Sequence, residues 1–222
     1  MNFKVVEKFV SVNGEGVKSG ELSIFIRFAG CNLRCSYCDT MWANKDDVEF
    51  TLMDENEIYN YIKETGVRNV TLTGGEPLLQ NHLETLLDLL CKDNDIEVEI
   101  ETNGSISLEK YNKSRHKHLS FTMDYKLNSS NMEDKMCLDN FNQLTSNDTV
   151  KFVIGSTIDL IKTKNIIDKY DLINKCYVYL SPVYNQIDMI EIVEFMKINK
   201  MNKARLQMQL HKIIWDKDER GV

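Results

Sequence analysis

The chain has 222 residues, of which 42% are hydrophobic and 27% charged, and its net charge is −7 at pH 7. This length is enough for one domain with a full core, and the negative charge argues against non-specific nucleic-acid binding. The sequence contains no apolar stretch near the roughly 18 residues of a membrane span and no basic-then-apolar leader. We therefore expect a cytoplasmic protein that contacts neither membrane nor nucleic acid directly.

Runs rich in β-branched and aromatic residues alternate with helical patterns along most of the chain. Residues at i, i+3, i+4 and i+7 predict three of the helices, and the fourth, 157–170, has a less regular pattern. Asp54 and Glu57 resemble an N-cap pair before the first of these helices. We expect strands at 22–28, 69–73, 96–102, 119–125, 149–155, 176–182 and 204–210, and helices at 58–65, 83–90, 157–170 and 189–196.

The order of these elements predicts the fold class. Strand, helix and strand in repetition indicate βαβ units and a mainly parallel α/β sheet, open or curled into part of a barrel. Two polar segments depart from this order. Segment 103–118 is expected to be a short helix or a loop, and segment 126–148, rich in Asn, Ser and Asp, is expected to leave the core. We predict one domain over residues 1–222.

The cysteines are concentrated at one place. Cys31, Cys35 and Cys38 fall within "GCNLRCSYCDT", after the predicted strand 22–28. A structural zinc site needs four protein ligands, and no second pair of closely spaced Cys or His follows. A disulfide is unfavourable in a reducing compartment. A four-iron cluster held by three thiolates leaves one iron open to a small molecule. The other cysteines are isolated, and we interpret them as packing residues: Cys91, Cys137 and Cys176.

The C-x3-C-x2-C spacing resembles that of the radical S-adenosylmethionine superfamily. "TLTGGEPLL" at 71–79 is similar to the superfamily segment that receives the methionine ammonium, and it ends a predicted strand, where α/β folds place ligands. The resemblance implies a partial (β/α) barrel, a [4Fe–4S] cluster and S-adenosyl-L-methionine. It implies cofactor contacts from Tyr37, Cys38, Asp39, Gly74, Gly75, Glu76, Glu101, Asn103, Asp124 and Lys126.

Several of these residues also have a purely structural interpretation. Glu76 is either a hydrogen-bond acceptor for the cofactor or an anchor of its own loop. Tyr37 is either a contact of the cluster and adenine or a half-buried tyrosine. Glu101 and Asn103 equally suit a strand followed by an Asn-Gly turn. The segment 121–127, "FTMDYKL", matches imperfectly, because Ser-Pro-Lys is commoner in the corresponding place.

Segments at both ends of the chain narrow the resemblance from the superfamily to one family within it. "EKFVSVNGEG" (7–16) and "QLHKIIWDKDERGV" (209–222) resemble the ends of the 7-carboxy-7-deazaguanine synthase family, with Asn13 where that family typically has Gln. This resemblance implies radical ring contraction of 6-carboxy-5,6,7,8-tetrahydropterin to 7-carboxy-7-deazaguanine with loss of ammonia, in queuosine or other 7-deazapurine biosynthesis. It also implies a homodimer and an electron from reduced flavodoxin or ferredoxin.

The same resemblance implies the substrate site. Thr40 would help to bind Mg²⁺, which prefers oxygen ligands and keeps several waters. The guanidinium of Arg27 suits a carboxylate in two-point contact. Glu15 either pairs with pterin N–H groups or caps its turn, and His211 either reaches the site or packs. The implied substrate contacts are Val12, Asn13, Gly14, Glu15, Arg27, Thr73 and His211.

Two other interpretations follow from the cysteine motif. A glycyl-radical enzyme activase shares the spacing, but both chain ends argue against it. An iron–sulfur electron-transfer protein or a zinc-binding interaction module is a different class. Electron transfer uses a cluster with four protein ligands, and neither protein explains the Gly-Gly-Glu-Pro strand end at 74–77.

Overall fold

The computed structural model describes residues 2–111, 116–216 and 219–222 of the chain. Its strands are β1 (Phe3–Val12), β2 (Leu22–Phe28), β3 (Thr51–Met53), β4 (Asn69–Gly74), β5 (Glu97–Thr102), β6 (Leu119–Lys126), β7 (Thr149–Ile154), β8 (Tyr177–Pro182) and β9 (Arg205–Leu206). The α-helices are α1 (Glu55–Thr65), α2 (Leu83–Leu90), α3 (Thr157–Tyr170), α4 (Met189–Ile198) and α5 (His211–Ile214). Short 3-10 helices are η1 (Met41–Asn44), η2 (Pro77–Leu79), η3 (Asn128–Ser130), η4 (Glu133–Lys135), η5 (Leu138–Asn142) and η6 (Leu172–Asn174).

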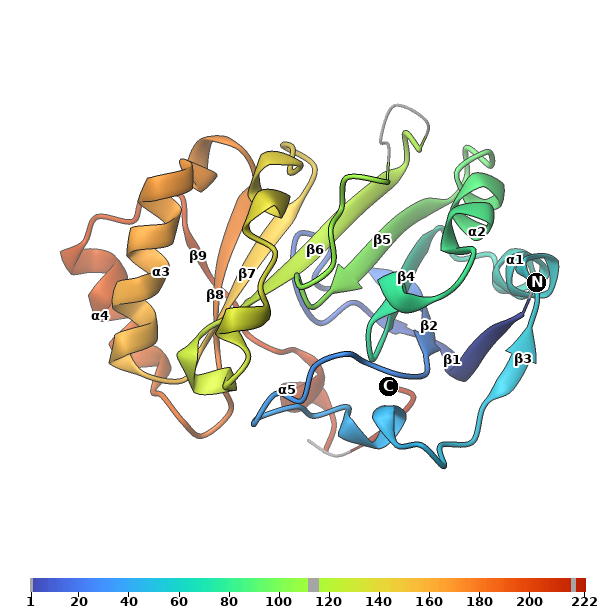
Figure 1. The fold of residues 1–222 in the computed structure, drawn as a ribbon, viewed down its shortest axis with the longest axis horizontal. Coiled ribbons are helices and arrows are strands. Elements are labelled where there is room, and N and C mark those ends of the chain that lie inside the picture. Colours follow the sequence, from blue (N-terminus) through green and yellow to red (C-terminus); the bar gives the residue numbers. More distant parts are fainter. Residues whose placement is uncertain (1, 112–115, 217–218) are drawn as a thin grey trace.

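The strands form a nine-stranded sheet of order β3-β1-β2-β4-β5-β6-β7-β8-β9 (Figure 1). Each neighbouring pair from β2 to β9 is parallel, and only β1 runs antiparallel to its neighbours β2 and β3. Helix α2 lies beside β4 and β5, α1 lies beyond it toward β1 and β3, and α3 and α4 lie over the β7–β9 half (Figure 1). The mainly parallel α/β prediction is confirmed.

Most predicted elements are confirmed, and α1 shows why. Asp54 accepts hydrogen bonds from Asn56 N and Glu57 N, both at 2.9 Å, while the Glu57 side chain accepts one from Asp54 N at 2.8 Å. This capping box satisfies amides that have no partner within the helix. Gly66 then ends the helix in the left-handed conformation, with φ of +68°.

One strand prediction needs correction, and two strands were not predicted. The predicted strand 204–210 is only Arg205–Leu206, because the chain then leaves the sheet edge and Leu210 N donates to Gly14 O at 3.2 Å. The sequence analysis also missed β1 and β3. They pair antiparallel at one edge of the sheet, outside the βαβ pattern on which the strand prediction rested.

Alternate strand residues face opposite sides of the sheet. One side is apolar, and with the helices it forms the core, which includes Ile26, Leu72, Ile100, Phe152 and Leu180. The other side carries polar and charged residues, and we call it the polar face: Arg27, Thr73, Glu99, Glu101, Thr122, Asp124 and Lys151. Parallel pairing sets Arg27 beside Thr73 and Asp124 beside Lys151.

Segment 126–148 does not leave the core, contrary to the prediction, because Leu127, Phe141 and Leu144 are buried in it. The segment also braces two loops through its 3-10 helices. Ser36 donates from its amide to Ser130 O at 3.1 Å and from its hydroxyl to Ser129 O at 2.6 Å. The buried Asn140 side chain donates to Ile106 O at 2.9 Å and accepts from Leu108 N at 3.0 Å. The segment therefore holds both the cysteine loop and the start of segment 103–118.

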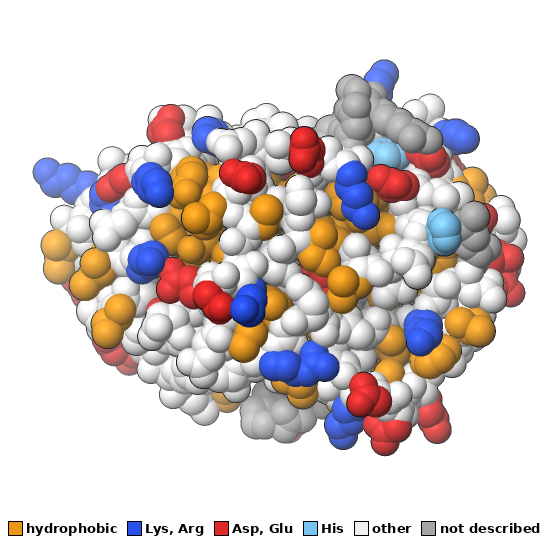
Figure 2. Space-filling view, viewed as in Figure 1, with side chains coloured by type: hydrophobic (Ala, Val, Ile, Leu, Met, Phe, Trp, Pro, Cys, Tyr) orange, Lys and Arg blue, Asp and Glu red, His pale blue; other side chains and the backbone are white. Residues whose placement is uncertain are grey.

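The described parts of segment 103–118 form turns rather than a helix, and residues 112–115 of that prediction lie outside the described residues. In the part of the chain that the structure describes, no helix has the length and apolar character to cross a membrane. On the face shown in Figure 2, Lys and Arg side chains alternate with Asp and Glu, and apolar side chains lie between them. This face therefore carries charge of both signs.

Candidate active site

The three motif cysteines lie together on the loop that leaves β2. Their thiols are half-buried, and burial raises the pKa of Cys31 and Cys35, with the neighbouring Cys38 adding to the effect. Two N–H groups point at the sulfur of Cys31: Leu33 N at 3.4 Å and Asn103 Nδ2 at 3.5 Å. Donors of this kind stabilise a thiolate.

The end of β4 packs directly against this loop. Glu76 N donates to Gly30 O at 2.8 Å, and Gly75 N to Phe28 O at 3.1 Å. A Cβ at Gly75 would lie 2.0 Å from Gly30 O and 2.2 Å from Asn44 Oδ1. Only glycine allows this approach, so the double glycine is what brings the strand end to the cysteines.

Glu76 is fully buried and serves as the anchor of its loop. Its Oε1 accepts from Leu78 N at 3.0 Å and Thr102 Oγ1 at 2.9 Å, and its Oε2 accepts from Asn103 N at 2.7 Å. Burial raises its pKa to about 7, although these donors favour the charged form. The contacts place Asn103 beside Cys31, and a contact of Glu76 with the cofactor stays a prediction.

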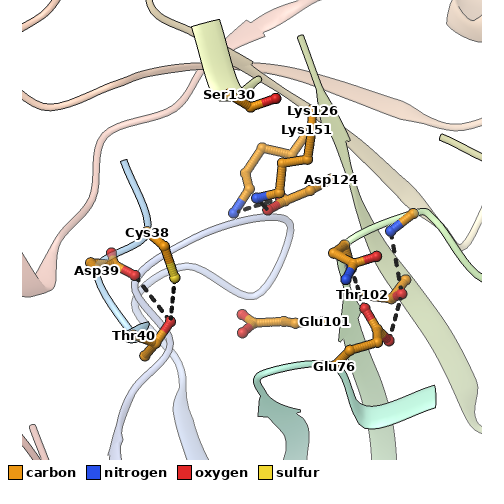
Figure 3. A network of polar contacts seen from close by, with 12 residues as sticks. Cys38, Asp39, Thr40, Glu76, Glu101, Thr102, Asp124, Lys126, Ser130 and Lys151 are labelled. Atoms are coloured by element: carbon orange, nitrogen blue, oxygen red, sulfur yellow. Dashed lines mark hydrogen bonds and ion pairs between the residues drawn. The ribbon is translucent and has the colours of Figure 1, made fainter. Parts of the chain in front are cut away.

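A network of opposite charges crosses the polar face at the ends of β6 and β7 (Figure 3). Asp124 contacts Lys126 Nζ at 2.6 Å through Oδ2 and Lys151 Nζ at 3.0 Å through Oδ1. Lys151 also forms an ion pair with Glu15. Burial alone would raise the pKa of Asp124, but the two lysines outweigh it and lower that pKa. The site therefore keeps charged groups within a largely buried setting.

Glu101 lies at the centre of the polar face. Its Oε2 accepts a hydrogen bond from Thr73 Oγ1 at 2.7 Å. In Figure 3 its carboxylate points toward the side of the site that holds Cys38 and Thr40. Burial raises its pKa to about 7, with Lys151 opposing this and other carboxylates adding to it. A carboxyl group with this pKa can hold or release a proton near neutral pH.

The loop after β1 is tied to the far end of the chain. Asn13 donates from Nδ2 to Glu99 Oε2 at 2.9 Å and accepts from Glu15 N at 3.1 Å. Glu15 Oε1 in turn accepts from Gln209 Nε2 at 2.7 Å. A Cβ at Gly14 would lie 3.1 Å from His211 Nδ1. These contacts bring the predicted substrate residues at both chain ends together, while the Asn13 side chain is bound to protein groups.

The remaining predicted residues border the same space. Thr40 Oγ1 donates to Asp39 Oδ1 at 3.2 Å and lies 3.9 Å from Cys38 Sγ. The ring of Tyr37 lies 5.8 Å from Lys126 Nζ, with its hydroxyl buried. Val12 is the last residue of β1 and pairs with Leu22.

Arg27 stands beside Thr73 on the polar face. Its Nε contacts Glu7 Oε2 at 3.1 Å. This ion pair leaves the terminal nitrogens of the guanidinium without a partner among the described residues. They are the atoms that bind a carboxylate at two points.

Sequence reasoning missed four residues of the site: Glu99, Lys151, Gln207 and Gln209. Two of them had a signal, because a charged residue at an alternate position of an otherwise apolar strand must face the polar side. Lys151 in "TVKFVI" and Glu99 in "EVEIET" fit this rule. Gln207, whose Oε1 accepts from Gly16 N at 2.7 Å, had none.

The donor set fits an iron–sulfur cluster. Cube-shaped clusters bind each cysteine at a different iron, so the thiols surround a volume and do not converge on a point. In residues 2–111, 116–216 and 219–222, no three Cys, His, Asp or Glu side chains converge as ligands of a single ion. The three thiols lie on one loop, with N–H donors at Cys31 and a glycine-lined approach beside them.

Comparison with known proteins shows the superfamily and the fold. The sequence profile described as the Radical SAM superfamily matches residues 25–196. The chain belongs to this superfamily. The fold is similar to that in the crystal structure of QueE from Escherichia coli, with a TM-score of 0.76 over 94% of each chain at 22% identity.

Full-length relatives define the family within it. The chain is 59% identical to the 7-carboxy-7-deazaguanine synthase of Clostridium acetobutylicum, over all of both chains. It is 32% identical to the enzyme of the same name from Chlorobaculum tepidum, over 98% of this chain and 96% of the relative. The chain is a member of the 7-carboxy-7-deazaguanine synthase family.

Proposed function

We propose that the chain converts 6-carboxy-5,6,7,8-tetrahydropterin to 7-carboxy-7-deazaguanine with release of ammonia. One observation carries the proposal: the pairing of β2, β4 and β5 sets Arg27, Thr73 and Glu101 in a row beside the cysteine loop. The row offers a cation for the substrate carboxylate, a hydroxyl, and a carboxyl group with a pKa near neutrality.

The predicted cofactor residues border the same space, and Glu101 belongs to both groups. When bound, the [4Fe–4S] cluster and S-adenosyl-L-methionine supply a carbon radical that removes a hydrogen atom from the substrate. Cys31, Cys35 and Cys38 hold the cluster. Backbone groups at 74–76 receive the methionine ammonium, and the adenosyl part contacts the following residues: Tyr37, Asp39, Glu101, Asn103, Asp124 and Lys126.

The substrate residues orient the pterin. Arg27 binds its carboxylate, Glu15 accepts its ring N–H groups, and Thr40 would help to hold a Mg²⁺ ion, which would supply positive charge beside the substrate. The backbone at 12–14 and the side chains of Thr73 and His211 border the pterin, while the Asn13 side chain holds Glu15 and Glu99. Glu101 exchanges a proton with the ring during ammonia loss.

Partners and setting form part of the proposal. The chain acts as a single domain in the cytoplasm, as a homodimer, and takes its electron from reduced flavodoxin or ferredoxin. Its product enters queuosine or another 7-deazapurine route. The support is the full-length similarity to the two synthases.

Anaerobic product analysis tests the proposed function. Reconstituted enzyme with S-adenosyl-L-methionine, a chemical reductant and 6-carboxytetrahydropterin is expected to yield 7-carboxy-7-deazaguanine and ammonia in equal amounts. Cleavage of S-adenosyl-L-methionine that is indifferent to the pterin would overturn the substrate assignment. No cleavage at all would favour an electron-transfer protein.

Replacing Arg27 with Gln is expected to raise the KM for the pterin about 10- to 100-fold, because a charge-assisted contact to the carboxylate is lost. Pterin-independent cleavage of S-adenosyl-L-methionine is expected to persist. Steady-state kinetics measure both. The matched control is Arg68→Gln, since Arg68 contacts Asp95 O at the surface. An unchanged pterin KM in Arg27→Gln would remove this residue from the substrate site.

Glu101 is expected to make folding stability depend on pH. Its pKa of about 7 exceeds its usual 4.5, so the folded chain keeps a proton that the unfolded chain releases. Stability is therefore lost as pH rises from about 4.5 to about 7, by about 2 kcal/mol after allowance for partial exposure. Urea unfolding of Glu101→Gln should show a stability gain over the wild type at pH 8 that vanishes near pH 4.5. If the free energies of unfolding of Glu101→Gln and the wild type changed with pH in the same way, the prediction would be wrong.

A further inference from the structure

A continuous series of partly buried polar contacts runs from the C-terminal segment to the side of the site that faces the cysteine loop. Gln209 contacts Glu15, Glu15 contacts Lys151, Lys151 contacts Asp124, and Asp124 contacts Lys126. Its members come from segments spread from residue 15 to residue 209. These contacts join the two halves of the site. Glu15 lies on the loop after β1, which carries predicted substrate contacts, and Asp124 lies near the end of β6, which carries predicted cofactor contacts. We call the loop after β1 the substrate loop.

Lys151 is the central member and touches both halves at once. It projects from β7 on the polar face, where pairing sets it beside Asp124. Its side chain is 13% exposed, and those of Glu15 and Asp124 are 11% and 18% exposed. Ionised side chains with so little exposure to solvent need a partner of opposite charge. If one member of an ion pair is removed, the charge of the other member is no longer compensated. With Lys126, the set holds two cations and two carboxylates, so it is neutral only while Lys151 is present.

The contacts leave Glu15 ready to accept a substrate. Lys151 binds its Oε2 and Gln209 donates to its Oε1. A carboxylate has about four acceptor positions, two on each oxygen. One position on each oxygen therefore stays free, and the side chain is fixed from behind at both oxygens. Such a carboxylate can accept two N–H groups from one edge of a planar ring without first losing side-chain freedom.

We propose that Lys151 is a positioning residue that fixes the Glu15 carboxylate for the pterin and couples the substrate loop to the strand end at the cofactor. The inference rests on the proposed function, because it names the pterin as the ligand of Glu15. Lys151 acts through Glu15 and does not touch the reacting atoms. Without it, Glu15 loses its orientation, and the pterin is bound less often in the position that the radical can reach.

Lys151→Met tests the coupling in the reconstituted holoenzyme, because methionine keeps most of the side-chain volume and removes the charge. We expect the pterin KM to rise about 10- to 100-fold, as for a lost hydrogen bond to a charged group. We expect more 5′-deoxyadenosine per pterin product, because cleavage is no longer matched to a positioned substrate. The Kd of S-adenosyl-L-methionine should change less than the pterin KM, since Lys126 still holds Asp124.

A double-mutant cycle separates positioning from general structural damage. If Lys151 acts through Glu15, adding Lys151→Met to Glu15→Gln raises the pterin KM little further. Lys151→Arg keeps the charge and should restore part of the KM. The matched control is Lys164→Met, because Lys164 lies on α3, outside the site, and its side chain is partly exposed and pairs with Asp168. It should leave every parameter unchanged.

The outcomes are decisive in each case. An unchanged pterin KM in Lys151→Met, or fully additive effects in the cycle, would overturn the proposal. If Lys151→Met does not fold, Lys151→Gln carries the test: it removes the charge but keeps a polar side chain, so the pterin KM should rise, and a wild-type KM in this variant would overturn the proposal. The wild-type arm keeps the two proposals apart, because a wild type that does not turn over the pterin refutes the proposed function.

Discussion

Cys38→Ala is expected to abolish radical chemistry while leaving the fold intact. Three thiols are the protein ligands of the proposed cluster, and removal of one leaves two. We expect the bound iron after anaerobic reconstitution to fall to a small fraction of the wild-type amount. Formation of 5′-deoxyadenosine should fall by about a thousandfold or more, which corresponds to about 4 kcal/mol in the barrier.

The control for Cys38→Ala is Cys137→Ala. Cys137 is also a half-buried free cysteine, and it lies in the segment between β6 and β7, before η5. It should keep wild-type iron content and activity. Thermal unfolding without the cluster should be similar for both variants. Full iron incorporation in Cys38→Ala would contradict the assignment of the three-cysteine loop as the cluster site.

Gly75→Ala is expected to separate the end of β4 from the cysteine loop. The added methyl group would lie 2.0 Å from Gly30 O and 2.2 Å from Asn44 Oδ1, and backbone must move to admit it. Overpacking of this kind costs about 1–3 kcal/mol. We expect a lower free energy of unfolding and at least a tenfold weaker binding of S-adenosyl-L-methionine, measured by urea unfolding and by equilibrium binding to the reconstituted protein.

Gly20→Ala is the matched control for Gly75→Ala. Gly20 has φ of +90°, but a Cβ there meets no atom within 4 Å. The substitution therefore costs only backbone strain, on the order of 1–2 kcal/mol. It should leave cofactor binding unchanged. Equal cofactor affinity in Gly75→Ala and the wild type would show that the close packing of β4 against the cysteine loop is not needed for the site.

The local parts of the site could be predicted from the sequence. Cys31, Cys35 and Cys38 lie within one loop, and Gly74 and Gly75 end one strand, so their chemistry is visible in a short window. The parallel sheet followed from alternation of strand and helix patterns. The structure adds why the glycines are needed, because Gly75 packs against the carbonyl of Gly30.

The parts that depend on distant contacts could not be predicted. Gln207 and Gln209 meet Gly16 and Glu15 only because the end of the chain crosses back to the loop after β1. No pattern within a short stretch of sequence predicts such a crossing. The same crossing ends β9 at Leu206, although the sequence beyond it alternates like a strand.

Asn13 shows how the structure refines a resemblance. The sequence has Asn where the family typically has Gln, and the side chain is occupied by Glu99 at 2.9 Å and by the amide of Glu15 at 3.1 Å. The amide nitrogen and the amide oxygen of this shorter side chain are both bound to protein groups, so the side chain orders its own loop. The Asn13 side chain therefore supports Glu15, and the pterin contact predicted for it falls more naturally to the backbone of this loop.

The most direct measurement is an anaerobic crystal structure of the enzyme with its cluster, S-adenosyl-L-methionine and 6-carboxytetrahydropterin. We predict a cluster held by Cys31, Cys35 and Cys38 alone, with the pterin on the polar face and its carboxylate within hydrogen-bond distance of Arg27. A fourth protein ligand on the cluster, or a pterin bound away from Arg27 and Glu101, would contradict this prediction.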